Sequence, residues 1–253
     1  MRLLLDLIRP TSGSAEILGL DSRRQSLEIR RRIGFLPGDL ALYPKLRGAD
    51  MLHHLAELRG AVDPRMRDEL AERFDADLRR PIRELSTGNR QKLGLIQAFM
   101  HEPELLILDE PISGLDPLVQ RSFHTLLAEV AGQGRTVFLS SHSLAEVEQV
   151  AHRVAILRQG RLVAVDSLES LRRVAVQRLE LEFADVPAAE PFRALPGVRE
   201  AKVVGRTLLV AFEGSVDAVL WAATAAGEVR AIRTHEDALE DIFLRYYGET
   251  DER

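Results

Sequence analysis

Two adjacent carboxylates, Asp109 and Glu110, follow a short apolar run in LILDEPISGLD, residues 106–116. Neighbouring side chains of a strand point to opposite faces, so both acids can address one site only if the strand unwinds there. A hard cation such as Mg²⁺ takes oxygen ligands, often one carboxylate together with substrate phosphates. The second carboxylate would then be free to orient a water molecule. An acid at a strand end is also a common helix cap, and for this pair alone both interpretations stay open.

Two other segments have residue types that bind or act on anions. In LSTGNRQ, residues 85–91, Ser86 is a good helix N-cap, and the small residues after it let an anion approach unpaired backbone N–H groups. For this segment taken alone, a plain helix cap is the simpler interpretation. In FLSSH, residues 138–142, His142 follows an apolar run. The other six histidines show no metal-ligand spacing, and the absence of G-x-S-x-G argues against a hydrolase triad.

Composition excludes several classes of protein. The chain has 253 residues, 45% hydrophobic and 29% charged, which suits one large domain or two modest ones. A net charge of −5 does not indicate a nucleic-acid partner. Because there is no cysteine, disulfides, thiolate metal sites and cysteine nucleophiles are excluded. No apolar run approaches the roughly eighteen residues of a membrane span, so we expect the chain to reach a membrane only through a partner.

Strands and helices alternate along the first two thirds of the chain and must position these residues. The apolar spacing predicts helices at 1–8, within 41–85, and at 86–102, 118–132 and 143–151, strands at 15–19, 33–36, 104–110 and 135–142, and a hairpin over 153–166. This order predicts a parallel or mixed sheet with helices on its faces. Ligands of such sheets bind outside the carboxyl ends of the strands, where Asp109, Glu110 and His142 fall.

A second unit begins near residue 175. Its pattern, with strands and helices in the order β-α-β-β-α-β-α and a last helix at 237–247, resembles a ferredoxin-like split βαβ. It contains no motif that carries chemistry, so a packing or regulatory role is the simpler interpretation.

Four motifs occur in an order that resembles the ATP-binding cassette family, the ATPase subunits of ABC transporters: LSTGN, LLILDEP, SGLD and SSH. The resemblance covers roughly residues 1–170. The resemblance implies an α/β, P-loop NTPase-like cassette core at 1–172. It also implies a helical subdomain at about 41–85 that docks on a membrane-spanning permease. The small α+β domain at 175–247 would be an accessory or regulatory domain.

The resemblance also implies a role for each matching residue. Asp109 would bind Mg²⁺ in Mg-ATP, Glu110 would polarise the attacking water, and His142 would lie near the γ-phosphate. Ser86, Thr87, Gly88 and Asn89 match the signature motif, which caps the γ-phosphate of an ATP bound on a second ATP-binding subunit. Residues 113–116, which end in Asp116, match the D-loop that crosses the dimer interface.

The tail DALEDIFLRYYG, residues 237–248, resembles the ending of multidrug or antibiotic exporter cassettes. We therefore expect an ATP-binding subunit that couples ATP binding and hydrolysis to export, and no nucleic-acid partner. It would be cytoplasmic and peripheral on the inner face of the cell membrane, bound to a permease and a second ATP-binding subunit. Two alternatives stay open: a non-transport cassette ATPase, and a non-hydrolytic subunit that lends its signature face to an intact partner.

Three features depart from the family pattern. The signature ends in Asn89 instead of glutamine, and Gly38 and Asp39 stand near the place of the Q-loop glutamine, with Asp39 a candidate substitute. The sequence contains no G-x-x-x-x-G-K-[ST] loop, which cradles phosphates in the family. Since residues 2–13 resemble the helix that follows this loop, we expect a truncated or disrupted gene that leaves an open apolar sheet edge. As given, the chain is expected to bind ATP poorly and to hydrolyse none.

Overall fold

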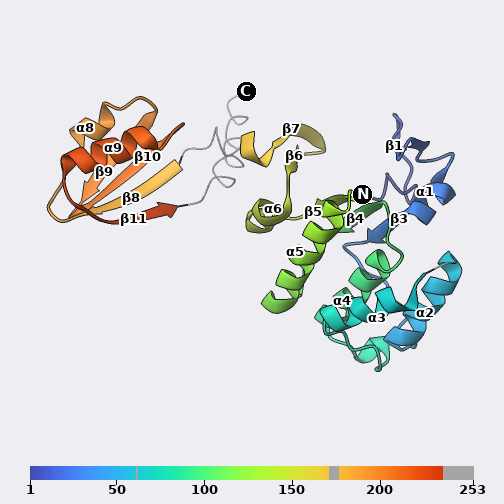
Figure 1. The fold of residues 1–253 in the computed structure, drawn as a ribbon. Coiled ribbons are helices and arrows are strands. Elements are labelled where there is room, and N and C mark those ends of the chain that lie inside the picture. The colour runs from blue at the N-terminus through green and yellow to red at the C-terminus, as the bar shows by residue number, and fades with distance from the viewer. Residues whose placement is uncertain (61, 171–176, 236–253) are drawn as a thin grey trace. The chain divides into compact units, whose positions relative to one another are not determined.

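The computed structural model describes residues 1–60, 62–170 and 177–235 (Figure 1). The chain forms two compact units, Met1–Ser143 and Leu144–Arg253. Every candidate site residue named above lies in the first unit.

The first unit is built on a parallel sheet, as the alternation of strands and helices predicts. Its strands are β3 (Ile33–Leu36), β4 (Leu105–Asp109) and β5 (Thr136–Ser140), in the order β3-β4-β5. In the register of the sheet, Leu36 pairs with Leu108 and Asp109 pairs with Ser140. Because all three strands are parallel, their carboxyl ends meet at one edge of the sheet, where Asp109 ends β4.

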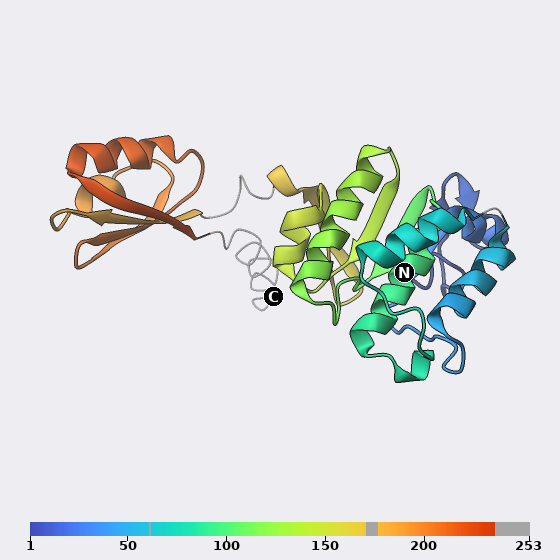
Figure 2. The ribbon, with the colours of Figure 1, turned by 60° about the horizontal axis from the view of Figure 1, so that its bottom comes forward.

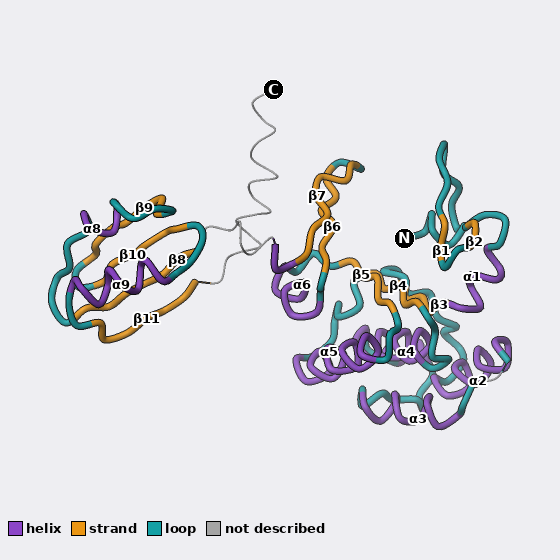
Figure 3. Tube along the Cα trace, turned by 45° about the horizontal axis from the view of Figure 1, so that its top comes forward, coloured by secondary structure: helices purple, strands orange, loops and turns teal. Residues whose placement is uncertain are grey.

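Helices α4 (Thr87–Phe99) and α5 (Pro117–Gly132) lie along one face of this sheet (Figure 3). Phe99 and Phe123 meet edge-on between these helices, with ring centroids 6.3 Å apart. A Cβ atom at Gly34 would stand 2.1 Å from the Ala98 carbonyl oxygen, so α4 approaches β3 closely enough that only glycine fits. A second apolar cluster includes the sheet residues Ile33 and Ile107 together with Leu5, Ile17 and Ile29.

Short elements complete the first unit. They are β1 (Glu16–Ile17), β2 (Leu20–Asp21), α1 (Ser26–Arg32), α2 (Gly48–Arg59), α3 (Pro64–Arg73) and the 3₁₀ turn η1 (Ile82–Glu84). Asp63 caps α3 by accepting a hydrogen bond from the backbone N–H of Arg65 at 2.9 Å. The predicted helical segment within 41–85 is therefore confirmed, whereas the strand predicted at 15–19 is only the two-residue β1 of a tight hairpin.

The helix predicted at the start of the chain is wrong. Residues 2–8 form successive turns, and Asp6 has a φ of 54°, which breaks helical hydrogen bonding. Leu5 is the buried residue at 3% exposure, while Leu7 and Ile8, on the predicted apolar face, are about half exposed at 52% and 50%. An eight-residue segment is too short to be a stable helix by propensity alone, so its few tertiary contacts decide its conformation.

The second unit begins with α6 (Leu144–Val150) and a hairpin of β6 (Arg153–Arg158) and β7 (Arg161–Ser167). Gln159 and Gly160 form its two-residue turn with φ values of 49° and 75°. Positive φ at both positions is the geometry that matches the twist of antiparallel strands. The predicted hairpin, with Gly160 in its turn, is confirmed.

Within this unit, residues 177–235 form a four-stranded antiparallel sheet with two helices. Its elements are β8 (Gln177–Phe183), α8 (Glu190–Arg193), β9 (Val198–Val204), β10 (Thr207–Phe212), α9 (Asp217–Ala226) and β11 (Val229–His235). The strand order β11-β8-β10-β9 places β10 between β8 and β9, which is the predicted split βαβ arrangement. Figure 2 shows the helices on one face of this sheet. The last predicted helix, at 237–247, lies outside the described residues.

Among the helices that the structure describes, none is both long enough and apolar enough to span a bilayer.

Candidate functional site

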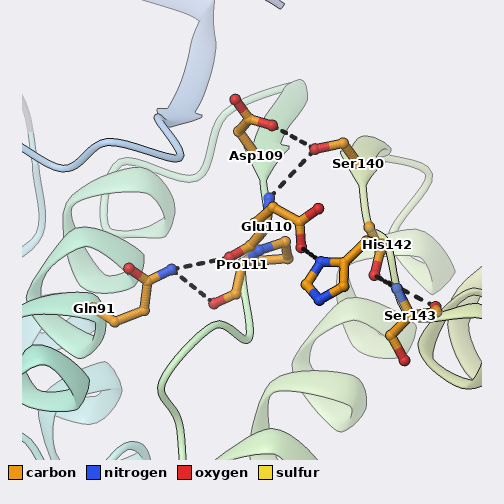
Figure 4. A network of polar contacts seen from close by, with 8 residues as sticks. Gln91, Asp109, Glu110, Pro111, Ser140, His142 and Ser143 are labelled. Atoms are coloured by element: carbon orange, nitrogen blue, oxygen red, sulfur yellow. Dashed lines mark hydrogen bonds and ion pairs between the residues drawn. The ribbon is translucent and has the colours of Figure 1, made fainter.

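Asp109 and Glu110 reach the same edge of the sheet because the strand ends between them. β4 stops at Asp109, and Glu110 has a φ of 50°, in the left-handed region that a non-glycine residue rarely adopts. Figure 4 shows that both carboxylates point toward residues at the end of β5. The condition set by the sequence, that the strand must unwind for both acids to act together, is therefore met. Such a strained backbone conformation persists only where its surroundings hold it.

Ser140, the last residue of β5, supplies part of that restraint. Its hydroxyl donates a hydrogen bond to Asp109 Oδ1 and accepts one from the backbone N–H of Glu110 at 3.3 Å. The Ser140 carbonyl oxygen also accepts from the Glu110 N–H, at 3.2 Å. This role could not be predicted from the sequence, because it depends on the register that pairs Asp109 with Ser140.

His142 is paired with Glu110. Its Nδ1 lies 2.7 Å from Glu110 Oε2, and because an ionised carboxylate only accepts, Nδ1 is the donor. The side chains of His142 and Glu110 are 84% and 33% exposed, so the pair is open to a ligand from solvent. The structure thus brings together three of the candidate residues, Asp109, Glu110 and His142, around Ser140 (Figure 4).

Gln91 ties α4 to the loop after β4, and its role was also missed. The side chain is buried, at 9% exposure for the residue, and its Nε2 donates to the carbonyl oxygens of Pro111 at 3.0 Å and Glu110 at 3.3 Å. Nearby, a Cβ atom at Gly88 would stand 2.6 Å from the Gly114 carbonyl oxygen. The start of α4 therefore packs directly against the loop at 113–116, and only glycine fits at position 88.

Ser86 and Asn89 shape the start of α4. The Ser86 hydroxyl accepts from the backbone N–H of Asn89 at 3.2 Å, which confirms the predicted N-cap. The Asn89 side chain donates to the same hydroxyl at 3.4 Å, and its Oδ1 accepts from the Asp77 N–H at 3.2 Å. Thr87 is the first residue of the helix. Asn89 thus ties α4 to the segment before it within the chain.

Asp116 caps α5. Its Oδ1 accepts from the backbone N–H groups of Val119 and Leu118, each at 3.1 Å. These hydrogen bonds, with the larger effect from Val119, hold the pKa of Asp116 below its usual range. On the other side of the site, a Cβ atom at Gly38 would stand 3.2 Å from Asp109 Oδ2, so the chain leaving β3 passes close to that carboxylate. Asp39 is exposed.

The oxygen atoms at this edge suit a hard cation but do not form a complete cage. Asp109 and Glu110 supply carboxylates, and Ser140 supplies a hydroxyl. Within residues 1–60, 62–170 and 177–235, no group of three or more His, Cys, Asp or Glu side chains could hold a metal ion. A cation here would need substrate phosphates and water as its remaining ligands, which is the usual arrangement for Mg²⁺ at phosphate-binding sites.

Comparisons with known proteins agree with this geometry. Residues 1–113 match the family model described as ABC transporter. An ABC transporter ATP-binding protein of Alkalihalophilus pseudofirmus is 34% identical over 98% of this chain and 94% of its own length. A daunorubicin resistance ATP-binding protein of Streptomyces coeruleorubidus is 34% identical over 98% and 83%. A bacitracin transport ATP-binding protein of Bacillus licheniformis is 35% identical over 73% and 61%.

Solved structures give the same family. An ATP-binding subunit of an ABC transporter is 29% identical, with a TM-score of 0.62, over 68% of this chain and 74% of that one. A dimeric bacterial ABC transporter cassette, 20% identical, shares the fold with a TM-score of 0.60 over 66% and 78%.

A parallel sheet with helices on its faces and paired acids at its carboxyl edge defines an α/β ATPase cassette of the P-loop NTPase class. The chain belongs to the ATP-binding proteins of ABC transporters.

Proposed function

We propose that this chain couples ATP binding and hydrolysis to the export of an antibiotic or another drug across a membrane. The names of the daunorubicin and bacitracin relatives support the class of substrate. The observation that carries the hydrolytic part is the Glu110–His142 pair, 2.7 Å apart, beside Asp109 at the carboxyl edge of the sheet. A structural cap would need neither the left-handed backbone at Glu110 nor its exposed histidine partner.

Each of these side chains has a distinct role in the proposed reaction. Asp109 would hold Mg²⁺ together with substrate phosphates, and the charge that the ion supplies would offset that of the phosphate oxygens. Glu110 accepts a hydrogen bond from water and orients it toward the γ-phosphate. His142 holds the Glu110 carboxylate through Nδ1, which leaves Nε2 to approach the γ-phosphate. Ser140 and Gln91 position Glu110 through its backbone.

The start of α4 serves a second ATP-binding subunit. Backbone N–H groups at a helix N-terminus and its dipole favour a phosphate, and Gly88 lets an anion come close. In this proposal Ser86, Thr87, Gly88 and Asn89 cap the ATP held by the second subunit, and Asp116 and the loop before it lie at the interface between the two subunits.

The partner in the membrane is a permease. In this proposal the helical segment at 41–85 docks on it and keeps residues 1–172, the cassette domain, at the cytoplasmic face of the membrane. Residues 175–247 form an accessory domain. The support is the transport name of the bacitracin relative.

Co-purification followed by an ATPase assay tests the proposal. The tagged chain, extracted from membranes of its source cells, should bring down a protein with membrane-spanning helices. Residues 1–253 contain no G-x-x-x-x-G-K-[ST] loop, so the complex should hydrolyse Mg-ATP only where this loop is supplied to the site. There, Glu110→Gln in this chain should lower turnover about 10²-fold or more, because the amide keeps the shape but cannot carry the charge that orients water. Glu129→Gln is the matched control, since Glu129 is exposed and pairs with Arg73 at the surface.

The outcomes separate the candidate functions. If Glu110→Gln leaves turnover unchanged but Gly88→Ala abolishes hydrolysis, the chain is a non-hydrolytic subunit that lends its signature face to an intact partner. A chain that brings down no membrane protein, yet hydrolyses ATP alone, would contradict transport and favour a non-transport cassette ATPase.

A further inference from the structure

The sheet of the second unit has one face that the described helices do not cover. The buried side chains Leu179, Leu181 and Phe183 of β8 pack with Phe192 of α8 and Val219 of α9. Because side chains alternate along a strand, the residues between those of β8 point to the opposite face. The same holds for Leu209 and Ala211 of β10, which alternate with the buried Leu208, Val210 and Phe212.

Four charged residues form a regular pattern on this open face. In the register of the sheet, Ala211 pairs with Arg178 on one side and Glu200 on the other, while Leu209 pairs with Glu180 and Lys202. Positive and negative charges therefore alternate both across the sheet and along β8 and β9. We call Arg178, Glu180, Glu200 and Lys202, with Leu209 and Ala211 between them, the checkerboard face.

The checkerboard face is hollowed and accessible. A shallow depression of about 310 Å³ lies over it, lined by all six of its residues. Arg178, Glu200 and Lys202 are exposed, and Leu209 and Ala211 are half-buried. Arg233 of β11 extends the pattern, since its guanidinium lies 3.8 Å from Glu180 and 3.9 Å from Glu182.

An alternating pattern of this kind is complementary to itself. If a second copy is turned over about an axis along β10, Arg178 meets the second copy's Glu200, and Glu180 meets its Lys202. If the axis instead runs across the strands, Arg178 meets the second copy's Glu180, and Lys202 meets its Glu200. Every charge faces an opposite charge in both cases, and the apolar column of β10 stacks on itself. An isologous contact requires this property.

We propose that the checkerboard face binds the same face of a second copy of this chain, as a dimer contact separate from the nucleotide-dependent one at α4. Strands about 4.8 Å apart, with residues of the same face about 6.8 Å apart along each strand, give these six residues an area of about 200 Å². A stable standard interface buries about 800 Å² on each partner. The contact is therefore weak by itself and strengthens when two copies are already held together, because their effective concentration reaches about the millimolar range.

Sedimentation of the purified full-length chain, without nucleotide, tests the contact. We expect concentration-dependent self-association that weakens between about 0.05 M and 0.5 M salt, since charge pairs are screened. Lys202→Glu should weaken it about tenfold or more, because the new carboxylate faces a carboxylate about either axis. Gly88→Ala, which alters the signature face, should leave this nucleotide-free association unchanged and so separates it from the dimer proposed above.

A variant with every sign inverted gives the sharpest result. Arg178→Glu, Glu180→Arg, Glu200→Lys and Lys202→Glu together keep the net charge and remain self-complementary, so this variant should associate with itself about as wild type does. It should not associate with wild type, because like charges then face each other. Free mixing of the two, or a wild-type chain that stays monomeric at every concentration, would overturn the proposal.

The absence of cysteine allows a second measurement that does not need the inverted variant to fold. A short bifunctional maleimide should cross-link Leu209→Cys into a dimer, since position 209 lies in the column that stacks on itself and face-to-face sheets lie about 10 Å apart, too far for a direct disulfide. Thr224→Cys, at an exposed position of α9 on the other side of the sheet, is the control and should remain monomeric. Equal cross-linking at both positions would mean random collision and would contradict the proposed contact.

Discussion

At the scale of single residues, Ser140 is the side chain on which both acids depend. Its hydroxyl contacts the Asp109 carboxylate and the Glu110 N–H. Ser140→Ala removes the hydroxyl that bonds the Asp109 carboxylate and the Glu110 N–H, both partly buried. It should lower the free energy of unfolding by about 1–3 kcal/mol, because a hydrogen bond to a charged group contributes more than one between neutral groups. Urea unfolding followed by circular dichroism measures the loss.

Two variants serve as controls for this prediction. Ser140→Thr keeps the hydroxyl and should retain most of the stability. Ser122→Ala removes only a hydroxyl that bonds the Leu118 carbonyl within α5, and it should change the stability little. If Ser140→Ala were as stable as wild type, the hydroxyl would not be what holds the acids.

At the scale of elements, His101 joins the end of α4 to β3. The ring Nε2 lies 3.0 Å from the Ile33 carbonyl oxygen, which can only accept, so Nε2 carries the proton. Burial, helped by the positive charge of Arg59, lowers the pKa of His101 from its ordinary 6.5 to about 4. The folded chain therefore holds this ring neutral at pH values where the unfolded chain has already protonated it.

This difference makes stability depend on pH. Between pH 6.5 and about 4 the unfolded state binds more protons, so the contribution of His101 is complete above pH 6.5 and is lost as the pH falls through that window. The whole loss is on the order of 1–3 kcal/mol. Urea unfolding at about pH 7, 6 and 5 should show a smaller decline for His101→Gln than for wild type.

His53→Gln is the matched control, because His53 is exposed and pairs with Glu57 on its own helix. It should keep the wild-type decline. Equal pH slopes for His101→Gln and wild type would show that the neutral ring does not contribute.

At the scale of the whole molecule, the C-terminal sheet has a core of its own. The cluster around Leu181, Phe183, Phe192 and Phe212 draws only on residues 179–229. We therefore expect a fragment of residues 175–247 to fold alone, to unfold cooperatively on heating, and to leave ATP unbound. About seventy residues bury enough apolar surface for only marginal stability, so the transition should be shallow.

Two substitutions check that this core holds the fragment. Phe192→Ala should cost about 3–5 kcal/mol and unfold it. Val186→Ala, at a position 69% exposed, should change little. A featureless circular dichroism spectrum for the unaltered fragment would contradict an independent fold.

Most elements could be predicted because their signals are local. The apolar run before Asp109 marks β4, and Ser86 marks the start of α4. In the C-terminal sheet, the alternation of buried and more exposed positions marks β8 and β10. Motif order was enough to single out Asp109, Glu110 and His142. The helix predicted at 1–8 is wrong because eight residues carry too little helical preference to resist tertiary contacts.

The sequence by itself determined which residues carry chemistry and which elements they end, because residue type, periodicity and caps act over a few neighbours. Only the tertiary structure decided how these residues meet. Ser140 reaches Asp109, and the four charges of the checkerboard face alternate, because separate strands pair in one register. Gln91 reaches Glu110 because α4 packs against the loop after β4. A shift of one residue would turn every side chain of a strand to the other face, and no local pattern reports that choice.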